Sequence, residues 1–108
     1  LSLHGVQFVH GNGHVVLRGI DLTLRPGEHV ALVGDNGSGK TTLAALLPRL
    51  WDPTGGRVCI DGVDVRELAL SRVRELVAVV LQETLLFAGT LRENVRLGRP
   101  SASAAEVD

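Results

Sequence analysis

The segment that most constrains the fold is the loop GDNGSGKTTL, residues 34–43. The run before it, residues 29–33, is mostly apolar without alternation, which is typical of a strand buried on both faces. The run after it, residues 40–47, favours a helix with its leucines on one face. Three glycines between them allow positive φ and remove Cβ atoms, so successive backbone N–H groups can converge on an anion. This arrangement predicts a phosphate site.

The spacing G-x-x-x-x-G-K-[ST] assigns roles to two side chains of the loop. Lys40 would reach the outer phosphates of a nucleoside triphosphate, and Thr41 would place its hydroxyl on the accompanying Mg²⁺. The alternative is a glycine-rich turn that only begins an ordinary helix. Spacing, preceding strand pattern and following helix pattern all fit the motif, so they favour the phosphate loop.

Composition excludes several classes of protein. The formal net charge is −1 and aromatic residues make up 3% of the chain, which argues against a nucleic-acid surface. The sequence has no apolar run long enough for a membrane span and no signal-peptide pattern at its start, so an aqueous compartment is expected. The single Cys59 is expected to be a small buried apolar residue.

Hydrophobic patterns predict an α/β domain with an added β sheet. Strands are expected at residues 3–9, 15–17, 20–24 and 57–60, and helices from residue 40 and over 71–76. Two S/T-x-x-E capping boxes, beginning at Thr90 and Ser103, predict two further helix starts. The apolar run 77–81 is expected to be a parallel strand beside 29–33, which would place Gly34 and Gln82 at the ligand-binding edge of the sheet.

Three segments together resemble one family. The phosphate loop, WDPTGGRVCIDGVDV (residues 51–65) and VVLQETLLFAGTLRENV (residues 79–95) are similar to the exporter-type nucleotide-binding domain of ATP-binding cassette (ABC) transporters. The resemblance covers residues 6–108. It implies a P-loop NTPase (RecA-like) core with an antiparallel β subdomain, of which residues 1–108 are the N-terminal portion; the absence of methionine and the helix start at Ser103 also suggest a piece of something larger.

The resemblance also implies a set of ligand-binding residues. ATP and Mg²⁺ would be held by Gly34, Asn36, Gly37, Ser38, Gly39, Lys40, Thr41 and Thr42. Gln82 would approach the metal and the attacking water, and with Lys40 it is the expected catalytic pair; the alternative is a solvated loop residue. His10 stands where the family usually places an aromatic residue that stacks on adenine. Its alternative is a partly exposed residue entering a turn.

The family's catalytic machinery is only partly represented. Its signature motif, catalytic glutamate and switch histidine are not found in this sequence. We therefore expect ATP hydrolysis and transport in an intact parent protein, and no turnover from the 108 residues alone. The expected partners are a transmembrane domain and a second nucleotide-binding domain, at the cytoplasmic face of a membrane. The alternatives are a soluble ABC ATPase without transport and a nucleotide-binding module without turnover.

The connection Leu85-Leu86-Phe87-Ala88 is unusually apolar for a loop. One interpretation is that Leu86 and Phe87 pack onto the domain's own core. The other is that they receive a short cytoplasmic helix of the transmembrane partner. Exposure of either side chain would favour the second interpretation.

Overall fold

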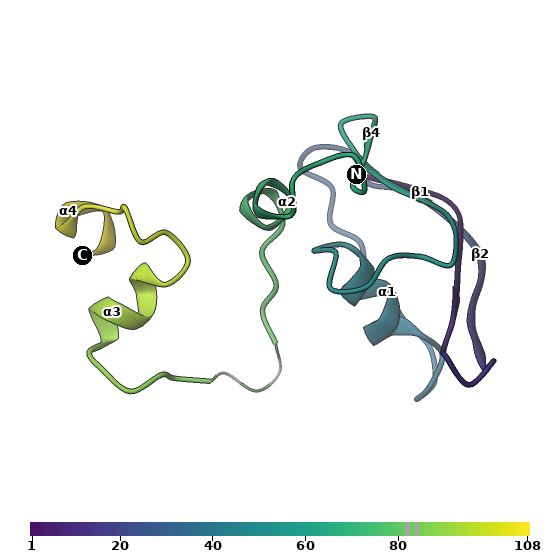
Figure 1. The fold of residues 1–108 in the computed structure, drawn as a ribbon, viewed down its shortest axis with the longest axis horizontal. Helices are drawn as coiled ribbons and strands as arrows, with labels where there is room; N and C mark the ends of the chain where they lie inside the picture. Colours follow the sequence, from purple (N-terminus) through teal and green to yellow (C-terminus); the bar gives the residue numbers. More distant parts are fainter. Residues whose placement is uncertain (82, 84) are drawn as a thin grey trace.

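The computed structural model describes residues 1–81, 83 and 85–108 (Figure 1). The elements in these residues are β1 (Ser2–Val9), β2 (Val15–Thr23), α1 (Lys40–Leu46), β3 (Gly55–Ile60), β4 (Val63–Asp64), α2 (Leu70–Leu76), α3 (Leu91–Arg96) and α4 (Ala104–Val107). The predicted strands and helices at 3–9, 57–60, 71–76, Thr90 and Ser103 are therefore confirmed within a few residues. The pieces expected at 15–17 and 20–24 form a single strand.

The strands of the described residues form one antiparallel sheet in the order β2-β1-β3-β4. β1 and β2 are joined by a tight turn in which the His10 N–H donates to the His14 carbonyl at 2.9 Å. The residues of β2 alternate, with Ile20 and Leu22 half-buried and Asp21 and Thr23 exposed. This is the pattern of a sheet with one face on a core and the other in water.

The core lies between one face of this sheet and the helices α1 and α2. Its buried side chains are Leu3, Val6, Phe8, Leu17, Leu43, Leu46, Val58, Val65 and Val73. The leucines at 43 and 46 lie three residues apart on α1, so both face the sheet as the helical period predicts. Cys59 is buried and free, as expected.

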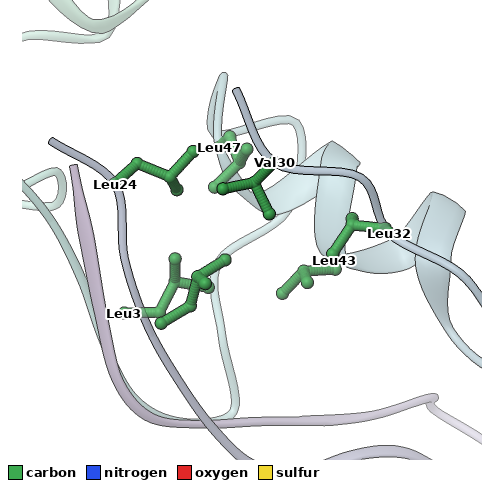
Figure 2. A pocket seen from close by; sticks show the side chains of 7 residues that line it. Leu3, Leu24, Val30, Leu32, Leu43 and Leu47 are labelled. Carbon is green, nitrogen blue, oxygen red and sulfur yellow. The ribbon is translucent and has the colours of Figure 1, made fainter. Parts of the chain in front are cut away.

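The expected strand at residues 29–33 does not form in the structure, although all five residues lie in its described part. Val30 and Leu32 point toward an apolar hollow that Leu3, Leu43 and Leu47 also line (Figure 2). The side chain on the other face, Val33, is 89% exposed. The prediction of burial on both faces was wrong because no segment among the described residues pairs with this backbone, and a strand needs such a neighbour.

The predicted strand at residues 77–81 is likewise not formed. After α2 the chain continues in an extended path through residue 81, and α3 and α4 lie at the opposite end of the molecule from β1 and β2 (Figure 1). Val80 is 92% exposed and Leu81 is 66% exposed. The described residues offer this run neither a neighbouring strand nor a covering helix.

The helices α3 and α4 begin with the predicted capping boxes. Thr90 N–H donates to Glu93 Oε2 at 2.7 Å, and Glu93 N–H donates to Thr90 Oγ1 at 3.2 Å. Ser103 N–H donates to Glu106 Oε2 at 2.9 Å in the same way. These backbone donors favour the charged carboxylates and hold the pKa of both Glu93 and Glu106 below the usual value. Neither helix contains a buried residue.

Candidate functional site

The glycine-rich loop runs from the extended segment 29–33 into α1. Within the loop, the Ser38 N–H donates to the Asp35 carbonyl at 3.2 Å and closes a turn. Gly37 has a φ of 79° and Gly39, the N-cap of α1, has a φ of 93°. Residues with side chains rarely adopt these angles, so both glycines serve the conformation that the sequence predicted.

Gly39 also places the loop directly against the sheet. A Cβ atom on Gly39 would lie 2.8 Å from Leu17 Cδ2 and 3.2 Å from Val16 Cγ1. The start of α1 therefore rests on β2 without an intervening side chain. This contact fixes the loop to the packed part of the molecule.

Lys40 lies across its own loop. Its Nζ donates to the Gly34 carbonyl at 2.7 Å, the Asp35 carbonyl at 2.6 Å and the Ser38 hydroxyl at 3.2 Å. The loop backbone and the Ser38 hydroxyl therefore hold the ammonium group at the centre of the turn. A cation placed there can meet the phosphates of a nucleotide that the loop encircles.

The two threonines that follow Lys40 have different surroundings. Thr41 is exposed at the start of α1, whereas Thr42 is 9% exposed and packs with the core. A hollow of about 230 Å³ lies beside Ser38, Gly39 and Lys40. The other predicted loop residues, Gly34 and Asn36, are exposed in the same turn. The polar groups of the loop border a mainly apolar space, which is otherwise lined by Leu17, Ile20, Leu32, Val33 and Leu43.

His10 directly follows β1 and belongs to a cluster of three rings. Its imidazole lies 5.2 Å from the Phe8 ring at 88° and 6.0 Å from the Trp51 ring at 80°. The Phe8 and Trp51 rings are stacked, 5.4 Å apart at 18°. Trp51 was not among the predicted site residues. Its position as the chain's single tryptophan, directly before an Asp-Pro turn, is the signal that could have drawn attention to it.

The predicted catalytic residue Gln82 lies outside the described residues. Among the residues that are described, no group of three or more His, Cys, Asp and Glu side chains could hold a metal ion. In the described parts of the chain, no helix is both long and apolar enough to cross a membrane.

The apolar connection before α3 is exposed, as one of the two interpretations predicted. Leu86 is 76% exposed and Phe87 is 64% exposed. The backbone of Phe87 is nevertheless fixed, because its N–H donates to Asn94 Oδ1 at 2.7 Å and its carbonyl accepts from Asn94 Nδ2 at 2.9 Å. Asn94 is a second residue whose role the sequence analysis did not identify. Together these residues form an apolar surface held on α3.

Comparisons with known proteins point to one family. A family model described as "ABC transporter" matches residues 17–108. The chain is 46% identical over 109 residues to an ATP-dependent lipid A-core flippase of Chromohalobacter salexigens, covering all of this chain and 19% of that protein. It is 50% identical over 100 residues to multidrug resistance protein 1 of Entamoeba histolytica, covering 91% of this chain and 8% of that protein.

A solved structure shares the fold. The structure of a bacterial Atm1-family ABC exporter with ATP bound matches with a TM-score of 0.88 and 36% identity, over 96% of this chain and 18% of that one. The chain thus spans less than a fifth of the length of these proteins. The likeness confirms the predicted P-loop NTPase fold with an antiparallel sheet, although the strands expected at residues 29–33 and 77–81 are not formed here.

Proposed function

We propose that this chain, which belongs to the ABC transporter family, is the N-terminal part of an exporter's ATP-binding domain and grips the phosphates of ATP. The observation that carries the proposal is the loop itself. Lys40 Nζ lies within 2.7 Å of two loop carbonyls, at the centre of the glycine turn. Relatives named as exporters and flippases support the same function.

The loop residues fit the phosphates of a nucleotide. Asn36, Gly37 and Ser38 are exposed and Gly39 is half-buried. Their backbone N–H groups would donate to phosphate oxygens, that of Ser38 after leaving the Asp35 carbonyl. Lys40 would turn its ammonium from the loop carbonyls to the outer phosphates. Bound Mg²⁺ would supply charge neutralisation, with the Thr41 hydroxyl as its ligand from α1 and Gln82 as its expected second contact from the chain.

The adenine would lie against His10. The imidazole is exposed at the end of β1, and the neighbouring strand β2 carries the residues on which Gly39 rests. The base and the phosphates would therefore contact two parts of the same packed unit. An imidazole offers less stacking area than a phenol ring, so exchanging His10 for tyrosine should tighten ATP binding.

Hydrolysis requires groups beyond those of the loop. In phosphoryl transfer the protein positions an attacking water and neutralises charge on the transferred phosphoryl group. This chain supplies the phosphate grip, while the catalytic glutamate, the signature motif and a second nucleotide-binding domain would come from the rest of the assembly. The 108 residues alone should then bind ATP without turning it over.

The apolar surface of Leu85, Leu86, Phe87 and Ala88 is the proposed contact with the membrane. Both large central side chains are exposed while Asn94 holds the backbone beneath them. An exposed apolar surface is what a short cytoplasmic helix of a transmembrane domain requires. The domain would accordingly work at the cytoplasmic face of the membrane.

The test of the proposed grip is ATP affinity in the intact protein. Replacing Lys40 with alanine should weaken binding by about ten- to a hundredfold, because a charge-assisted hydrogen bond contributes roughly 1.5–3 kcal/mol. Arg72→Ala is the matched control, since it removes one positive charge from α2, where Arg72 pairs only with Glu75 among the described residues. Equal ATP affinity in the Lys40→Ala and unmodified proteins would refute the assignment.

A further inference from the structure

The three rings that cluster at the end of β1 have a defined orientation relative to one another. Phe8 and Trp51 are nearly parallel, and His10 is nearly perpendicular to both, with centroid separations between 5.2 and 6.0 Å. Edge-to-face and offset-stacked geometries are those that aromatic quadrupoles favour. The orientation of the imidazole is therefore set by two rings rather than by one.

The three rings differ in how firmly they are held. Phe8 is 8% exposed and belongs to the core, so the stack is anchored at its inner end. Trp51 is 46% exposed and His10 is exposed. His10 is fixed through its backbone by the turn that joins β1 and β2. Its side chain, in contrast, gains its order from Phe8 and Trp51.

The segment that carries Trp51 is itself clamped. Arg49 has a φ of 55°, which residues other than glycine rarely adopt. Its Nε donates to Asp52 Oδ1 at 2.8 Å, and its NH1 donates to the carbonyls of Val65 and Leu68 at 3.2 and 3.3 Å. These contacts join Arg49, which precedes Trp51, to residues that all follow Trp51 in the sequence. The indole is thus presented from a turn with fixed backbone geometry.

We propose that Trp51 is a positioning residue for His10: it holds the imidazole edge-on to the Phe8–Trp51 stack and so sets the ring surface offered to the nucleotide base. The inference rests on the proposed binding of ATP and on the proposed role of His10. On this proposal Trp51, which lies outside the phosphate loop, controls the affinity for the base and does not change the affinity for the phosphates. Phe8 contributes the buried end of the same support.

The first experiment measures equilibrium binding of ATP and of inorganic triphosphate to the intact protein. Trp51→Leu keeps apolar bulk and removes the ring, and it should weaken ATP binding by about three- to tenfold. Triphosphate affinity should be unchanged, because that ligand has no base. Trp51→Phe should restore most of the ATP affinity. Leu50→Ala, at an exposed neighbour in the same segment, should alter neither affinity.

The second experiment separates positioning from a general structural role. In a His10→Ala background, Trp51→Leu should have no further effect on ATP affinity, because the ring that it orients is gone. The NMR signals of the His10 ring protons, recorded without nucleotide, should move toward those of a free imidazole in Trp51→Leu and much less in Trp51→Phe. This second readout does not depend on ATP binding.

Four outcomes would overturn the inference. They are unchanged ATP affinity in Trp51→Leu, an equal loss of triphosphate affinity, an undiminished effect in the His10→Ala background, and unmoved His10 signals. If Lys40→Ala still weakens ATP binding in the same series, the proposed function stands while the role of Trp51 falls. If Lys40→Ala has no effect, the proposed function itself fails.

Discussion

Residues 1–76 and residues 77–108 contain similar apolar side chains but bury them very differently. The first region holds all nine residues of the core cluster. In the second, among the described residues, Ala102 is the one buried apolar side chain, while Val80, Leu85, Leu86 and Phe87 are more than 60% exposed. Burial in this molecule therefore depends on whether a partner surface lies within reach, and apolar character alone does not secure it.

The two regions also have different proposed roles. The phosphate loop is attached to the packed region through Gly39, which rests on β2. A loop that must hold several N–H groups in one arrangement benefits from rigid support. The exposed apolar surface before α3 belongs to the other region, where a partner can reach it. On this proposal, ligand binding would use the packed part of the chain and partner docking would use the unpartnered part.

One leucine truncation in each region tests this difference in burial and should give the largest effect. Leu46→Ala removes a side chain with 0% exposure and should lower the free energy of unfolding by about 2–5 kcal/mol. Leu86→Ala changes a side chain that is 76% exposed and should alter it by less than about 0.5 kcal/mol. Denaturant unfolding of the two variants measures both values.

The Leu86 variant also tests the docking surface. In the intact protein, Leu86→Ala should reduce the coupling of ATP hydrolysis to transport while ATP affinity is kept. A destabilisation by Leu86→Ala that matched Leu46→Ala would mean that residues 77–108 have a core of their own. The contrast between the regions would then be wrong.

A smaller effect is expected from two glycines of the phosphate loop. Gly39→Ala combines a φ of 93° with a Cβ 2.8 Å from Leu17, and should cost about 2–3 kcal/mol. Gly37→Ala has a φ of 79° but no atom within 4 Å of the new Cβ, so about 1–2 kcal/mol is expected from the backbone alone. Thermal unfolding compares them, and equal losses would show that contact with β2 does not anchor the loop.

Local signals in the sequence predicted more of this structure than long-range ones. Both capping boxes need four consecutive residues, and both formed at Thr90 and Ser103 as expected. The glycine loop and the start of α1 at Lys40 were also predicted correctly. In each case the interacting groups lie within a few residues of one another. Tertiary context has little opportunity to override such patterns.

The predictions that failed required distant partners. Residues 29–33 and 77–81 carry the apolar pattern of strands buried on both faces, yet burial of a strand depends on neighbours that its own sequence does not encode. Trp51 was missed for a related reason. Its approach to His10 joins segments about forty residues apart, and only the assembled sheet brings them together.

The smallest expected effect concerns pH and the capping box of α3. Hydrogen bonds from Thr90 lower the pKa of Glu93 below its usual 4.5. Because the pKa of Glu93 is lower in the folded state, these hydrogen bonds stabilise the start of α3 fully at pH values above the usual pKa of 4.5. The stabilisation is lost as the pH falls through the lowered pKa. NMR shifts of the Thr90 amide should follow this loss. Glu93→Gln should abolish the titration, and a titration that persists would assign it to another group.

Amide hydrogen exchange on this chain, with and without MgATP, tests most directly that the phosphate grip rests on the packed region. We expect slow exchange in β1 and β3, ATP-dependent slowing across residues 36–42, and fast exchange in α3 and α4 under both conditions. Exchange across residues 36–42 that is identical with and without MgATP, or α3 amides as slow as those of β1, would contradict it.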